Sequence, residues 1–163
     1  MLNKIKIALA TSVVAAAMLS SGAQAATATG TAKVEILTPV TLSTVTDLDF
    51  GLVAAGASTG TVTLPTGSNT RACSNVTCMG TATRGSFQVS TASQGQVIQL
   101  STTNATLTGP GASMLVTTSL SASSVTFNSA ALETVYVGGA LSVGLNQTAG
   151  NYTGAFTVTA DYQ

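Results

Sequence analysis

The stretch that most constrains the fold is the last thirteen residues, 151–163, because they alternate without a break. One set shares a face of an extended strand: Tyr152, Gly154, Phe156, Val158, Ala160 and Tyr162. The other face carries Asn151, Thr153, Ala155, Thr157, Thr159 and Asp161. This period of two predicts a β-strand with one buried and one wet face. Chain ends usually fray, so we expect another strand to pair with this one.

The first residues have the pattern of a secretory signal peptide. Lys4 and Lys6 precede an apolar run at residues 7–19, and the small-residue sequence 23–25 is typical of a cleavage site after Ala25. A membrane anchor is the weaker interpretation, because the run is shorter than the ~20 residues that span a bilayer. The sequence therefore predicts a signal peptide at 1–25, an N-terminal extension at 26–38 and one domain at 39–163.

The composition after residue 25 excludes some classes of partner. Three basic and five acidic residues give a net charge of 3 − 5 = −2, and they are Lys33, Arg71, Arg84, Glu35, Asp47, Asp49, Glu133 and Asp161. Nucleic-acid affinity depends on clustered Lys and Arg, so nucleic acid is not expected as a partner. Thr, Ser, Val, Ala and Gly dominate, and they favour short strands and tight turns.

Strand-like runs separated by turn signals recur along the chain. They are expected at residues 41–53, 61–64, 85–91, 96–101, 113–120, 123–127 and 132–145. This spacing predicts an all-β, antiparallel, immunoglobulin-like β-sandwich. We expect residues 132–145 to form a hairpin with the C-terminal strand, and Gly138-Gly139 to mark a bulge or bend.

The two cysteines, Cys73 and Cys78, predict a disulfide in an exported protein. Closing so short a loop stabilises by roughly 2 kcal/mol in the chain-entropy model. We expect the bridge to staple a loop or hairpin. A metal or redox site is the weaker interpretation, because the spacing is not C-x-x-C and the chain has no His.

Catalytic chemistry finds little support in these residues. A Ser–His–Asp arrangement needs His, and a Ser–Lys variant would have to use Lys33. Asp47 and Asp49 could suggest a glycosidase pair or a calcium site, but we expect them on the solvated face of a strand whose other face carries Leu48 and Phe50. We therefore predict no enzyme, no catalytic residue, no cofactor, no metal and no small-molecule substrate.

A second alternating segment lies near the N-terminus. One of its faces carries Ala28, Gly30, Ala32, Val34 and Ile36. Two interpretations stay open: the segment is the first strand of this molecule, or it is an extension that pairs with a different molecule.

Together the two ends resemble a subunit of the chaperone–usher pilus family. Tyr162 matches the family's penultimate aromatic residue, and Gly150 matches its glycine about a dozen residues upstream. The resemblance implies a pilin-like sandwich short of one strand, which exposes an edge at Gly150, Tyr152, Gly154, Phe156, Val158, Ala160 and Tyr162. It implies a donor strand at Ala28, Gly30, Ala32, Val34 and Ile36.

The same resemblance implies a structural fimbrial subunit that polymerises head to tail. Its partners would be sister subunits, a periplasmic chaperone and an outer-membrane usher, and its route would lead through the periplasm to the cell surface. The alternative is a self-complete secreted β-sandwich with a surface-coat or binding role.

The middle of the chain is similar to a second family, a secreted bacterial domain of unknown function, number 4402. The similar residues are Asp47-Leu48-Asp49-Phe50-Gly51, Tyr136-Val137-Gly138-Gly139 and Gly150-Asn151-Tyr152-Thr153-Gly154-Ala155-Phe156. This resemblance implies no activity.

Overall fold

The computed structural model describes residues 25–91, 93–128 and 132–163 and divides the chain into two compact units, residues 1–35 and 36–163. The predicted signal peptide, apart from Ala25, lies outside the described residues. In the first unit, residues 25–35 form no helix or strand and are exposed throughout. The strands all lie in the second unit, which we call the sandwich unit.

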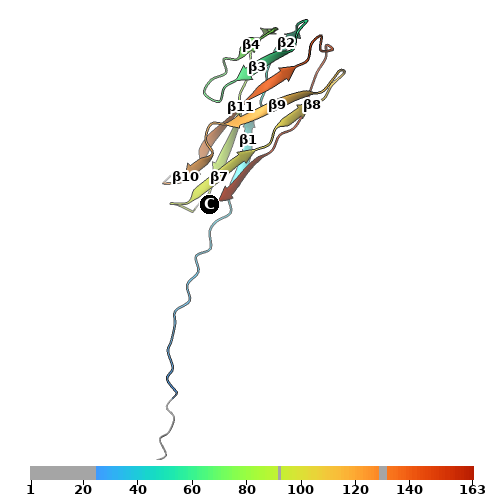
Figure 1. Ribbon diagram of the computed structural model, residues 1–163. Coiled ribbons are helices and arrows are strands. Elements are labelled where there is room, and N and C mark those ends of the chain that lie inside the picture. Colours follow the sequence, from blue (N-terminus) through green and yellow to red (C-terminus); the bar gives the residue numbers. More distant parts are fainter. Residues whose placement is uncertain (1–24, 92, 129–131) are drawn as a thin grey trace, which may run out of the picture. The chain divides into compact units, whose positions relative to one another are not determined.

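The described residues contain strands and no helix, so the all-β fold class is confirmed (Figure 1). The strands are β1 (Thr41–Thr46), β2 (Leu52–Ala55), β3 (Gly60–Leu64), β4 (Ala72–Ser74), β5 (Val76–Met79), β6 (Gly85–Ser90), β7 (Val97–Thr102), β8 (Ala105–Leu107), β9 (Met114–Leu120), β10 (Ser124–Thr126), β11 (Glu133–Val143) and β12 (Val158–Tyr162). Within the described ranges, no helix is long and apolar enough to cross a membrane.

The larger sheet has seven antiparallel strands built around β11, the longest of them. One edge of β11 pairs with β6 through its first half and with β3 through its second half. The other edge pairs with β9, which in turn pairs with β8. β1 extends the sheet beyond β6, and β4 extends it beyond β3.

The second layer of the sandwich consists of two smaller sheets. One has the order β10-β7-β12, and the other pairs β2 with β5. In Figure 1 the label C lies beside β7 and β10, and β2, β3 and β4 lie at the opposite end.

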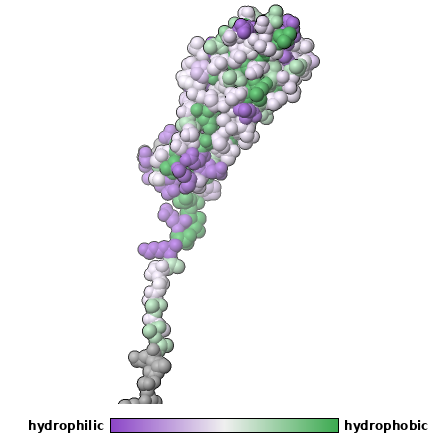
Figure 2. All heavy atoms as spheres, viewed as in Figure 1, coloured by the Kyte–Doolittle hydropathy of each residue, from purple (hydrophilic) through white to green (hydrophobic). Residues whose placement is uncertain are grey.

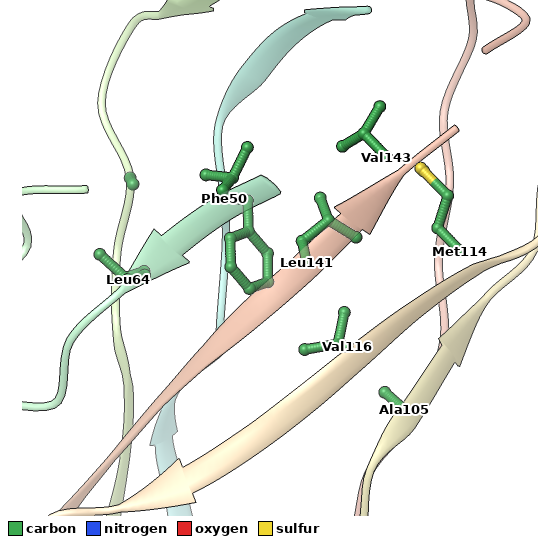
Figure 3. Packing of buried hydrophobic residues seen from close by; sticks show 9 residues of the cluster. Phe50, Leu64, Ala105, Met114, Val116, Leu141 and Val143 are labelled. Atoms are coloured by element: carbon green, nitrogen blue, oxygen red, sulfur yellow. The ribbon is translucent and has the colours of Figure 1, made fainter. Parts of the chain in front are cut away.

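Each part of the second layer covers its own part of the core. At the β3 end the buried cluster includes Phe50, Val62, Leu64, Val116 and Leu141. Figure 3 shows the Phe50 ring beside Leu141, which projects from β11. At the β7 end the buried cluster is Val89, Ile98, Leu100, Phe127 and Val135. Apolar residues therefore occupy alternate positions on strands of both layers and meet between them.

A bulge or a bend was predicted at the Gly138-Gly139 pair. The β11–β9 register runs on through both residues, so this ladder has no bulge there, whereas on the other edge of β11 the partner changes from β6 to β3 at Gly138. A Cβ at Gly138 would lie 2.8 Å from the Thr66 nitrogen and 2.9 Å from the Pro65 carbonyl carbon. Glycine is required there because the chain leaving β3 crosses directly over β11.

Most predicted strands are confirmed to within about two residues, but the predicted hairpin is wrong. β11 lies in the larger sheet, whereas β12 pairs with β7 in the other layer. Crossing between layers lets the apolar faces of the two strands meet across the core, which side-by-side pairing would not allow. The run predicted at 41–53 is also divided, into β1 and β2, and the short strands β4, β5 and β8 were not predicted.

Candidate functional site

The candidate site is the edge of β12 that faces away from β7. Among the described residues, β7 is the one strand that pairs with β12. The Gln163 N–H donates to the Val97 carbonyl at 3.0 Å. Bonded positions recur at every second residue of an antiparallel ladder, so the odd-numbered residues of β12 turn their backbone groups toward β7. The even-numbered residues turn theirs toward the free edge: Val158, Ala160 and Tyr162.

The side chains of these even-numbered residues face the core, yet the core is incompletely covered beside them. Val158 is buried, whereas Ala160 and Tyr162 are half-buried. The same partial exposure recurs on other inward-facing apolar residues near this edge. We call the half-buried set the open strip: Leu42, Phe87, Phe156, Ala160 and Tyr162.

Phe87 shows how local this exposure is. It lies on β6 between Gly85 and Val89, which share its face of the strand and are both buried. Phe87 itself is half-buried, and its ring meets Phe156 edge to face with centroids 5.9 Å apart and planes at 74°. Each ring therefore shields part of the other from solvent.

β1 forms the opposite border of the open strip. It pairs with β6 through one edge only, and its register slips between Thr44 and Thr46. Thr44 lies opposite Phe87 in the ladder and is exposed. In the part of the chain that the structure describes, the open strip is therefore bordered by one unpaired strand edge from each layer.

Tyr162 connects the end of β12 to the chain that leads into β1. Its hydroxyl donates to the Thr38 carbonyl and lies 2.7 Å from the Thr91 hydroxyl, which is buried. The Thr38 N–H donates to the Ser93 hydroxyl at 2.8 Å. Both backbone groups of Thr38 are thus held, and the entry to the sandwich unit is fixed at this residue.

The predicted donor residues lie before this point. Residues 25–40 form no strand, and residues 25–36 are all exposed (Figure 2). Val34 is 86 % exposed and Ile36 is 88 % exposed. Neither face of the alternating segment at residues 28–36 is therefore buried within this chain.

The first half of the predicted edge strand is not on the free edge of β12, so the single strand predicted at 151–163 is wrong in length. Tyr152 packs on the turn at residues 109–111, since a Cβ at Gly109 would lie 2.6 Å from its ring. The Tyr152 hydroxyl donates to the Thr148 carbonyl at 2.8 Å. Gly154 rests against the Thr106 backbone, and Thr153 forms an isolated bridge with Thr108. These contacts hold residues 150–154 beside β8.

Gly150 provides the backbone conformation at the start of this segment. Its φ of 147° is a conformation that favours glycine, and the Pro110 ring packs against it. Of the predicted edge residues, the structure brings Phe156, Val158, Ala160 and Tyr162 together at the open strip. It places Gly150, Tyr152 and Gly154 at the neighbouring turn.

The predicted disulfide between Cys73 and Cys78 is present, with Cα atoms 6.4 Å apart. It does more than staple a loop: Cys73 lies on β4 of the larger sheet, and Cys78 lies on β5 of the two-stranded sheet. Arg71 reinforces this junction by donating to the carbonyls of Phe50, Leu52, Met79 and Gly80.

Asp47 and Asp49 are exposed, but they lie between β1 and β2 and not on one continuous strand. Asp49 accepts a hydrogen bond from the Gly51 N–H at 2.7 Å, and Gly51 has a φ of 69°. This is an Asx turn, so the role of Asp49 visible here is structural. Among the described residues, no group of three or more His, Cys, Asp or Glu side chains is arranged to hold a metal ion.

The fold and this edge define a β-sandwich protein in which, among the described residues, β12 is paired along one side. A model of the family described as a domain of unknown function, DUF4402, matches residues 40–162, and the chain belongs to this family. Neither the curated proteins nor the solved structures contain a match to the chain.

Sequence reasoning missed the contribution of β1 and β6 to the open strip. Leu42 and Phe87 each occupy an apolar position in an alternating run, which predicts burial equally for every such residue. Their partial exposure depends on which strands become neighbours, and no local pattern carries that information.

Proposed function

We propose that this protein is a structural subunit of a surface fibre, completed by a strand from another copy of itself. The observation that carries the proposal is the free edge of β12, lined on its inner side by the open strip. A strand from another chain usually adds to a sheet at an unpaired edge that is flanked by exposed apolar side chains.

The strand order supports this proposal. The order β1-β6-β11-β9 in one layer and β7-β12 in the other corresponds to strands A-B-E-D and C-F of an immunoglobulin constant-type sandwich. In that sandwich a further strand, G, lies beside F. The free edge of β12 corresponds to that position.

The N-terminal segment has the properties of a donor strand. Its even-numbered residues are apolar and exposed, from Ala28 to Ile36. The small residues at 28, 30 and 32 suit a shallow site, and Val34 and Ile36 would supply anchors of roughly 1.5–3 kcal/mol each when fully buried.

A contact of this kind leads to polymerisation. Each copy offers one donor segment and one acceptor edge at different places on its surface, so the contact is heterologous. Such contacts form open filaments when the rotation between copies does not close a ring. The resemblance to chaperone–usher pilins adds a chaperone that fills the edge before assembly, an usher and a location at the cell surface.

The test compares two neighbouring substitutions in the exposed segment. Ala32→Asp places a charge on the face proposed to enter the strip, and Thr31→Asp places the same charge on the opposite face. We expect Ala32→Asp to abolish fibres seen by electron microscopy and high-mass species in sedimentation, while Thr31→Asp assembles normally. Fibres formed equally well by the Ala32→Asp protein would refute the proposal.

The self-complete secreted sandwich remains the competing function. If this function is correct, the protein is a soluble monomer that folds without a chaperone, and neither aspartate substitution changes its mass in sedimentation. Sedimentation of the unsubstituted protein therefore separates the two functions directly.

A further inference from the structure

A second surface of the sandwich unit lies at the far end of the open strip from Tyr162. It consists of residues 56–60, 109–113 and 144–150, which we call the loop end. The Asn146 N–H donates to the Gly56 carbonyl at 2.9 Å. The Gln147 side-chain amide donates to the Ala112 carbonyl at 2.5 Å and to the Tyr152 hydroxyl at 2.9 Å. These bonds join the loops into one surface.

The loop end is uncharged and consists mainly of small and polar residues. Its three segments contain no Asp, Glu, Lys or Arg. Leu145 is 58 % exposed, and Leu115, at the start of β9, is 48 % exposed. Leu115 lines an open depression of about 460 Å³, whose other lining residues are both apolar and polar: Thr59, Gly60, Thr61, Ser113, Met114, Ser142, Val143 and Gly144.

The attachment of the donor segment limits where a donating copy can lie. Thr38 is held through its N–H and its carbonyl, and Leu37 alone separates it from Ile36. An extended chain advances about 3.3 Å per residue. The sandwich unit of the donating copy must therefore begin within roughly 10 Å of the point where Ile36 of that copy leaves the open strip of the accepting copy.

The direction of the donated strand decides at which end of the open strip Ile36 of the donating copy leaves it. An antiparallel ladder is the more stable pairing per residue, and it would run the donor from Tyr162 toward Phe156. The Tyr162 end is also the place where the acceptor's own chain enters at Thr38. Both considerations put the donor's Ile36, and the sandwich unit attached to it, at the loop end.

We infer that the loop end, with Leu145 on its surface and Leu115 of β9 beside it, is the docking face for the sandwich unit of the next copy. This inference rests on the proposed function, since it concerns the copy whose strand enters the open strip. It adds a second contact of a different kind, between folded units, which an isolated donor peptide cannot make. A surface without charges suits this role because no ion has to be desolvated on contact.

The experiment uses Leu145→Asp and the matched control Leu132→Asp. Leu132 is also 58 % exposed, and it lies just before β11, whereas Leu145 lies just after it. Each is placed in a full chain that carries Ala32→Asp, which accepts a strand but does not donate one. Two ligands are titrated into each acceptor: a peptide of residues 26–38 and the unsubstituted chain. Thermal unfolding verifies that each acceptor is folded, and Leu115→Asp serves as a second variant.

We expect the peptide to bind all acceptors equally, and the unsubstituted chain to bind the Leu145→Asp acceptor about tenfold more weakly than the Leu132→Asp acceptor. Equal affinity of the unsubstituted chain for both acceptors, with the peptide still bound, would overturn the inference and leave the proposed function standing. Failure of the peptide to bind any acceptor would overturn the proposed function itself, and the inference with it.

Discussion

Replacing Val34 and Ile36 together by serine is expected to weaken strand donation strongly while leaving the single subunit as stable as before. The two side chains are 86 % and 88 % exposed in the chain by itself. Burying them in the open strip of another copy contributes about 1.5–3 kcal/mol each, hence about 3–6 kcal/mol together. At 1.4 kcal/mol per factor of ten, the dissociation constant should rise about 10²- to 10⁴-fold.

The assay is fluorescence anisotropy of a labelled peptide of residues 26–38, titrated with the full chain that carries Ala32→Asp. The control peptide carries Lys33→Ser and Glu35→Ser, which lie on the opposite face, and it should bind within about threefold of the unsubstituted peptide. In the full chain, the serine substitutions at 34 and 36 should change the free energy of unfolding by no more than about 0.5 kcal/mol. If both peptides lose the same affinity, the burial argument is wrong.

Two further predictions concern the sandwich unit itself. Gly138→Ala should lower the free energy of unfolding by about 1–3 kcal/mol in urea titration, because its Cβ would meet the backbone that follows β3; Gly67→Ala, where nothing lies within 4 Å, should not. Replacing Cys73 and Cys78 by serine should cost about 2 kcal/mol, and hydrogen exchange should rise first in β2 and β5, which the disulfide joins to the larger sheet. Uniform exchange across all strands would argue against that local role.

The pattern of residues predicted individual strands well and their pairing poorly. The run at 132–145 became β11, and the face of Val135, Val137 and Leu141 is buried as its alternation requires. The hairpin between β11 and β12 was wrong, because alternation says which side of a strand is apolar but not which strand lies beside it.

The candidate site likewise contains residues whose place was predicted correctly and residues whose place was not. The even-numbered residues from Phe156 to Tyr162 face inward as predicted, whereas Gly150, Tyr152 and Gly154 serve a turn. That difference arises from residues 106–111, which precede this segment by about forty positions or more and meet it only after folding; Thr108, for example, pairs with Thr153.

By itself, the sequence determined the all-β class, most strand positions, the apolar face of each and the pairing of its two cysteines. These properties depend on neighbours within a few residues, where backbone geometry fixes the direction of each side chain. Only the tertiary structure decided that β12 has one partner among the described strands, that Leu42 and Phe87 belong to the open strip, and that the disulfide joins two sheets. Those features depend on which distant segments come into contact. The free energy gained by burying apolar surface is non-directional, so many different arrangements of the same strands would gain a similar amount.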